Sequence, residues 1–101
     1  MQGYMIYFTV PNLNETNKIV DHLITKNYVS CANIITNVVS VYKWTNKIAR
    51  DKEILVICKT TKDTKMVIKE IKNLHSYTTP CITAYNMSDV DNDYLKWMNN
   101  N

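Results

Sequence analysis

One short stretch of this chain gathers side chains that could bind a metal ion or a polar ligand. It runs Leu74-His75-Ser76-Tyr77-Thr78-Thr79-Pro80-Cys81 and so places an imidazole, a phenol and a thiol close together. Apolar residues recur at helical spacing before it, and an extended segment follows, with Pro80 turning Thr79 away from helix. Connections between two fixed elements often carry functional side chains. We therefore expect His75 to lie near any site.

Three side chains are candidate ligands for a divalent metal: His75, Cys81 and Cys31. A thiolate beside an imidazole suits copper or zinc, although the spacing of His75 and Cys81 matches no zinc signature. Each also has an interpretation without metal. His75 would then be a hinge histidine with a satisfied ring, and Cys31 would be buried beside Ala32. The third cysteine, Cys58, alternates with apolar residues, which predicts a place in the core.

A second group of side chains could line a ligand-binding cleft: Lys59, Tyr77, Trp44, Glu53 and Tyr42. Lys59 follows an apolar run, where a charge needs a partner. Glu53 lies too far along the same strand to reach it within one chain, so contact across a subunit boundary would pair them. Tyr42 and Trp44 share one face of their strand. They suit a ligand wall or, as we favour, a subunit contact.

The composition argues against several functional classes. A net charge of +3 with scattered basic residues gives no basic patch for nucleic acid, and a single glycine excludes glycine-rich phosphate loops. No serine has the context of a nucleophile and no paired carboxylates stand out, so we expect no enzymatic activity and no organic cofactor. His22, on a helix beside Asp21, reads as a solvated residue. These patterns favour a binding or structural role.

Cysteine usage and hydropathy bear on the compartment. Three cysteines without a CxxC pair favour a reducing, cytoplasmic setting over a disulfide framework. The N-terminal Met1-Gln2-Gly3 has no basic segment typical of a secretory signal. No apolar run approaches the roughly 18 residues of a membrane span, so we expect no membrane association.

The predicted elements that position these residues form one domain over residues 1–101. The pattern predicts strands at 4–10, 28–44, 53–61 and 81–87, helices at about 12–26, 63–74 and from 91, and a frayed tail at 98–101. Asn12 has the form of a helix N-cap. Thr36-Asn37 suggests a bulge, and Thr45-Asn46 a tight turn. The order β-α-β-β-α-β is typical of a ferredoxin-like α+β fold, an antiparallel sheet with two helices on one face.

The predicted hairpin around Thr45-Asn46 is too long for a lone subunit. Its strands far exceed the usual ~5–6 residues, and two helices of about three turns cannot cover it. Val41, Tyr42, Trp44 and Ile48 would face water at its tip. Long apolar edges invite pairing, so we expect neighbouring subunits to cover the projecting hairpin.

Taken together, these segments resemble the CutA family of divalent-cation tolerance proteins. The family patterns are Thr-x-Pro, Cys-x-Asn-Ile, Ser-x-Tyr-x-Trp, Glu…Lys-Thr-Thr, His-Pro-Tyr-x-x-Pro-Glu and Tyr-Leu-x-Trp. The matching segments are Thr9-Val10-Pro11, Cys31-Ala32-Asn33-Ile34-Ile35, Ser40-Val41-Tyr42-Lys43-Trp44, Glu53 with Lys59-Thr60-Thr61, His75-Ser76-Tyr77 with Pro80, and Tyr94-Leu95 with Trp97. Six short matches in the right order span nearly the whole chain.

The resemblance implies a ferredoxin-like homotrimer with clefts between subunits, binding of copper or another divalent metal, and a role in the response to metal ions. The copper ligands assigned in some bacterial members fall on Phe8, Leu74 and His75, so only His75 matches. Ser76 replaces a proline of the signature, and Cys81 replaces its glutamate, where the thiol would be a compensating ligand. The alternatives are a small-anion cleft between subunits that uses Lys59, and a purely structural scaffold.

Overall fold

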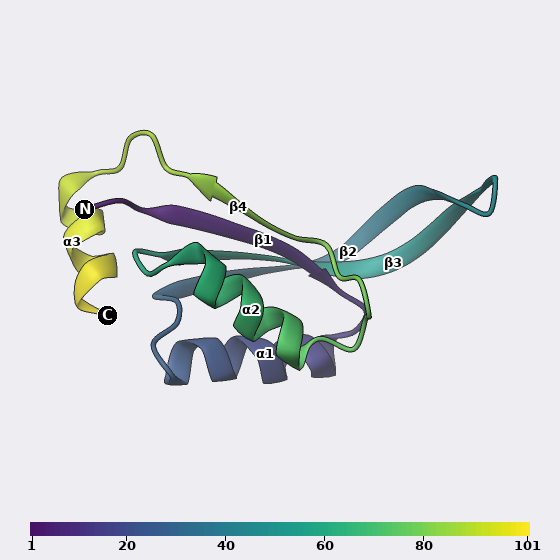
Figure 1. Ribbon diagram of the computed structural model, residues 1–101, viewed down its shortest axis with the longest axis horizontal. Helices are drawn as coiled ribbons and strands as arrows, with labels where there is room; N and C mark the ends of the chain where they lie inside the picture. Colours follow the sequence, from purple (N-terminus) through teal and green to yellow (C-terminus); the bar gives the residue numbers. More distant parts are fainter.

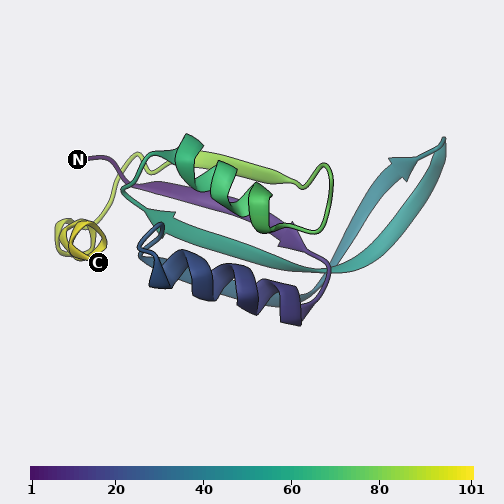
Figure 2. The ribbon, with the colours of Figure 1, turned by 60° about the horizontal axis from the view of Figure 1, so that its bottom comes forward.

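The computed structural model describes all 101 residues as a four-stranded antiparallel sheet with helices on one face (Figures 1 and 2). The elements are β1 (Tyr4–Val10), α1 (Leu13–Thr25), β2 (Cys31–Trp44), β3 (Lys47–Thr60), α2 (Thr64–Leu74), β4 (Ile82–Asn86) and α3 (Asn92–Asn100). The strand order is β2-β3-β1-β4. This confirms the predicted ferredoxin-like α+β arrangement. No helix is both long and apolar enough to span a bilayer.

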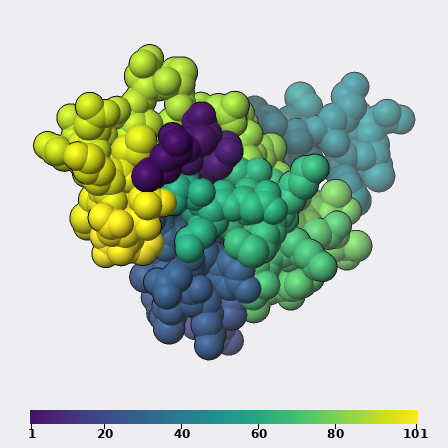
Figure 3. Space-filling model, turned by 60° about the vertical axis from the view of Figure 1, so that its left-hand side comes forward, coloured from purple at the N-terminus to yellow at the C-terminus, as the bar shows by residue number.

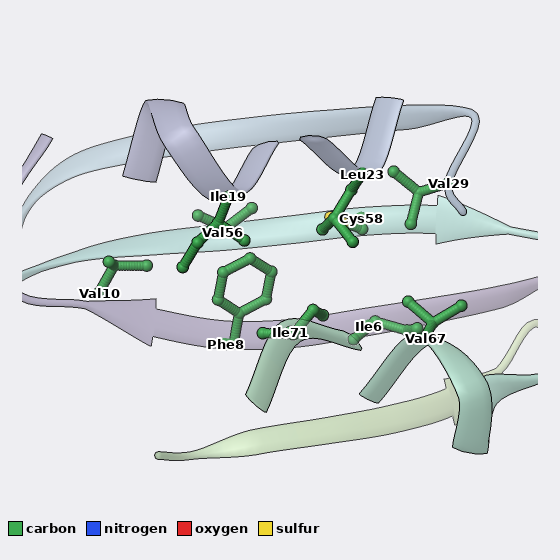
Figure 4. Packing of buried hydrophobic residues seen from close by; sticks show 10 residues of the cluster. All are labelled: Ile6, Phe8, Val10, Ile19, Leu23, Val29, Val56, Cys58, Val67 and Ile71. Carbon is green, nitrogen blue, oxygen red and sulfur yellow. The ribbon is translucent and has the colours of Figure 1, made fainter. Parts of the chain in front are cut away.

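The hydrophobic core fills the space between the sheet and the two helices (Figure 4). Each helix buries one apolar stripe, Ile19 and Leu23 from α1 and Val67 and Ile71 from α2. The sheet contributes alternate residues of its two central strands, because successive strand side chains point to opposite faces. These are Ile6, Phe8 and Val10 of β1 and Val56 and Cys58 of β3. The expected core position of Cys58 is confirmed.

The other face of the sheet carries no helix (Figure 2). Leu55 and Ile57 of β3 lie there, half-buried, while Ile35 beside them on β2 is exposed. The uncovered face explains why the run Ile54–Cys58 is apolar on both sides although only one side is buried in a single chain. This face and the hairpin beyond it carry apolar side chains that nothing in the chain covers.

The β2–β3 hairpin projects beyond the rest of the molecule (Figure 1). The whole chain, hairpin included, measures 46 × 26 × 23 Å. Both strands have 14 residues. A register shift between Ile35 and Val38, with Asn37 at φ 62°, forms the expected bulge. Thr45 and Asn46 have φ values of 46° and 64°, typical of the tight hairpin turn that the sequence indicates. Trp44 and Ile48 are exposed at the tip, at 68% and 72%.

The C-terminal helix contradicts the expected frayed tail. α3 continues to Asn100, and Met98 is fully buried. The Ser30 hydroxyl donates to the Met98 carbonyl at 2.6 Å, which ties the helix to the start of β2. Figure 3 shows the first residues of the chain against this helix, where Gly3 packs beside the Met87 and Met98 side chains. Apolar side chains among the asparagines therefore anchor the tail.

Loss of the α1 cap is expected to destabilise the protein. The Asn12 side chain accepts a hydrogen bond from the Glu15 backbone amide at 2.8 Å, as the sequence predicts. Asn12→Ala leaves this amide without its partner and should lower the free energy of unfolding by about 1 kcal/mol, measured by urea denaturation. Asn12→Ser, which keeps a capping oxygen, is the control. An equal loss in both variants would contradict a capping role.

Candidate functional site

A hollow of about 430 Å³ lies between one face of the β2–β3 hairpin and the α2–β4 connection. Its lining residues are Thr9, Tyr42, Trp44, Asp51, Glu53, Tyr77, Thr79 and Cys81. Four of the five predicted cleft residues therefore meet here, together with Cys81, one of the predicted metal ligands. The hollow is the place where most of the sequence-derived site residues converge.

The alternation of the strands explains which side chains reach the hollow. Tyr42 and Trp44 stand two apart on β2, and Asp51 and Glu53 stand two apart on β3, so each pair shares a face. Thr9 belongs to β1, where its neighbours Phe8 and Val10 enter the core instead. Sequence reasoning did not select Asp51, although its position two residues before Glu53 was a usable signal.

Two tyrosine–carboxylate pairs dominate the electrostatics of the hollow. The Tyr77 hydroxyl donates to Glu53 Oε2 at 3.2 Å, and the Tyr42 hydroxyl donates to Asp51. Burial, followed by the charge of Glu53 and this hydrogen bond, raises the pKa of Tyr77 to about 12. The hydrogen bond to Asp51 raises the pKa of Tyr42 as well. At neutral pH both phenols stay protonated and donate to the carboxylates.

No positive side chain neutralises these carboxylates within the chain. The two ion pairs of the structure join histidines to Glu70 and Glu15, so neither Asp51 nor Glu53 has a lysine or arginine within 4.0 Å. Lys59, predicted in the cleft, does not line it. It follows Glu53 by six residues on the same strand, roughly 20 Å at about 3.3 Å per residue. Its ammonium lies 5.7 Å from the Tyr94 ring centre instead.

His75 lies under the hollow and is not part of its wall. It caps the C-terminal end of α2, and its side chain has no exposed surface. Nε2 is 2.7 Å from the Thr9 carbonyl oxygen, and the Tyr77 amide donates to Nδ1 at 3.0 Å. The structure thus places His75 next to the hollow, while both of its ring nitrogens already have protein partners.

The three predicted metal ligands do not converge in one chain. Cys31 is opposite Lys59 in the sheet, whereas Cys81 lies beside the far end of β1, three strands away. Strands about 4.8 Å apart, together with the four-residue offset along β1 between Met5, level with Cys31, and Thr9, level with Cys81, place the two backbones roughly 20 Å from each other. No group of three histidine, cysteine, aspartate or glutamate side chains is arranged to hold an ion. The predicted ligand set is therefore not assembled within one chain.

The second histidine differs from its expected solvated role. His22 Nε2 lies 2.6 Å from Glu70 Oε1, so the side chain joins α1 to α2, and its ring stacks on Tyr28. His22 lies on the side of α1 that faces α2. The sequence of α1 alone does not show which helix packs beside it.

Glu15 holds the connection after α2 against α1. Its carboxylate accepts from the Ser76 amide at 3.0 Å and lies 3.6 Å from His75 Nδ1, so it does not close a capping box with Asn12. Partial burial raises the pKa of Glu15, but the hydrogen bonds from Ser76 and the charge of Lys18 outweigh it and leave the pKa below its ordinary 4.5.

Acid should remove the stability that Glu15 contributes. Because its pKa is lower in the folded chain, the contribution is complete above the unfolded-state pKa and disappears as the pH falls through the folded-state value. Wild type should therefore exceed Glu15→Gln in free energy of unfolding at neutral pH, and the difference should shrink below about pH 4.5. Urea denaturation across this range measures it, with Asn14→Gln as control. A pH-independent difference would contradict the assignment.

Comparisons with known proteins identify the family of the chain. The model of the CutA1 divalent ion tolerance protein family matches residues 4–101. The chain belongs to the CutA family. Among its relatives, the divalent-cation tolerance protein CutA of Pyrococcus horikoshii is 38% identical over 95 residues, covering 93% of this chain and 92% of the relative. The CutA protein of Thermus thermophilus is 32% identical over 98 residues, covering 96% and 95%.

Solved CutA structures show the same fold. The CutA1 structure from Ehrlichia chaffeensis superposes with a TM-score of 0.93 at 29% identity, over 97% of this chain and 92% of that one. Of the two replaced residues at the positions that the resemblance links to copper, Phe8 lies in the core and Leu74 is exposed. Neither residue lines the hollow.

Proposed function

We propose that this CutA-family protein is a homotrimer that binds divalent cations at the hollow and takes part in the response to metal ions. The observation that carries the proposal is the pair Asp51 and Glu53, two carboxylates in one hollow without a cationic partner. The relatives' designation as divalent-cation tolerance proteins supports it. A binding role, without catalysis, fits this arrangement.

The donor types of the hollow suit a borderline ion. Carboxylates favour hard ions and a thiolate favours soft ones, so Asp51 and Glu53 together with Cys81 would suit Cu²⁺ or Zn²⁺. Because no three such donors converge in one chain, a neighbouring subunit would supply the remainder. The exposed hairpin and the uncovered sheet face support such an assembly. The unpaired cysteines agree with a reducing, cytoplasmic setting.

The anion-binding alternative lacks support from the geometry. Its central residue, Lys59, lies away from the hollow, and the charged side chains that line the hollow are both carboxylates. Within one chain these carboxylates would repel an anion, so an anion site would need Lys59 of a neighbouring subunit. A purely structural scaffold stays an alternative and predicts no saturable cation binding.

Calorimetric titration of the reduced protein with Cu²⁺, using a weak chelator as competitor, tests the proposal. We expect a saturable event near one ion per chain. Asp51→Asn with Glu53→Gln should weaken binding by about tenfold or more, since charged donors are replaced by neutral amides. Asp89→Asn, an exposed carboxylate outside the hollow, is the control and should bind like wild type. Absence of a saturable event would favour the scaffold.

A further inference from the structure

The imidazole of His75 is fixed in one tautomer by its neighbours. A backbone amide can only donate, so the contact from the Tyr77 amide at 3.0 Å requires an unprotonated Nδ1. The proton of the neutral ring then sits on Nε2 and is donated to the Thr9 carbonyl at 2.7 Å. Both nitrogens are thus in use, in a side chain without solvent contact.

Both partners of the imidazole form part of the wall of the hollow. Thr9 and Tyr77 are lining residues, whereas His75 is not. The Tyr77 ring packs on the imidazole with centroids 4.9 Å apart, and its hydroxyl continues to Glu53 at 3.2 Å. A continuous set of contacts therefore leads from His75 through Tyr77 to a carboxylate of the hollow.

We propose that His75 is a positioning residue that fixes Tyr77 and Thr9 at the hollow and does not itself contact the bound cation. The proposal rests on the proposed function for the identity of the site. A ligand role would require a ring nitrogen to leave the Tyr77 amide or the Thr9 carbonyl, and the abandoned backbone group would be left without a partner. It would also require the imidazole to move out from beneath the wall.

Nitrogen-15 NMR of the histidine rings tests the tautomer without any metal. We expect His75 to show a protonated Nε2 and an unprotonated Nδ1 at neutral pH, with His22→Gln identifying the two signals. A proton on Nδ1, as in an imidazolium paired with Glu15, would overturn the proposal because the Tyr77 amide would have no acceptor. This measurement tests the tautomer of His75 even if the protein binds no cation. Failure of this proposal and failure of the proposed function can therefore be distinguished.

Addition of Zn²⁺ to the same sample tests whether the imidazole of His75 contacts the bound cation. The expected result is that the Tyr77 and Thr9 amide signals shift while the ring nitrogens of His75 stay in place. A large shift of either ring nitrogen would show direct coordination and overturn the proposal.

Substitution gives a further readout. His75→Phe keeps a ring but removes both hydrogen bonds, so the Tyr77 amide should lose its protection from hydrogen exchange, and Zn²⁺ affinity should fall by about tenfold. Protection equal to wild type in a folded variant would overturn the positioning role. If His75→Phe does not fold, the two wild-type spectra still decide.

Discussion

Phe8→Cys is expected to lower the free energy of unfolding by about 3 kcal/mol, at the lower end of values for large-to-small aromatic replacements in cores. The Phe8 side chain is fully buried between β1 and the helices. A thiol fills much less of that space, and the surrounding core relaxes only partly. Since domains are stable by only about 5–15 kcal/mol, this is a large fraction of the total.

The same substitution should not restore a bacterial type of copper site. The side chain of Phe8 points from β1 toward the helices, whereas the side chain of the next residue, Thr9, lines the hollow on the other face of the sheet. A cysteine at position 8 would thus be separated from the hollow by the sheet. Urea denaturation and Cu²⁺ titration measure the two effects, with Phe8→Leu as the volume control. Tighter Cu²⁺ binding by Phe8→Cys without loss of stability would contradict this placement.

Trp44→Ala combined with Ile48→Ser should weaken self-association without unfolding the subunit. Both side chains are largely exposed at the hairpin tip, so truncating them costs the isolated chain little. In an assembly, a buried tryptophan is a typical hot spot worth about 2 kcal/mol or more, roughly a 30-fold change in dissociation constant.

Sedimentation velocity across a dilution series measures this effect. Trp97→Ala is a matched control, because Trp97 is also an exposed tryptophan but lies on α3, at the opposite end of the molecule. We expect the hairpin variant to dissociate at concentrations at which wild type and Trp97→Ala stay associated. Identical profiles for all three proteins would show that the hairpin tip takes no part in assembly.

The fold was readable from the sequence because local signals agreed with the tertiary arrangement. The residues that reveal this are the cap at Asn12, the bulge at Asn37 and the turn at Thr45-Asn46, each of which appears where its side-chain chemistry predicts. Each of these signals acts within a few residues and needs no information about distant contacts.

The site was only partly readable because it depends on register between strands. The positions of Tyr42, Trp44 and Glu53 follow from alternation, but which part of β3 borders the hollow, near Glu53 or near Lys59, depends on where the α2–β4 connection lies. The hydrogen bonds of His75 to Thr9 and Tyr77 join segments 66 and 2 residues apart. The contact with Thr9, 66 residues away in sequence, cannot be inferred from local spacing. The sequence therefore indicated a candidate ligand where the structure has a buried imidazole.

The position of β1 in the sheet has a consequence for synthesis of the protein. β1 leaves the ribosome before its hydrogen-bonding partners β3 and β4, and β4 begins only at Ile82. The β2–β3 hairpin is local and can form as soon as both its strands have emerged, whereas the central strand must wait for nearly the whole chain. During that interval one edge of β1 stays unpaired, and unpaired strand edges make the nascent chain prone to aggregation until β4 arrives.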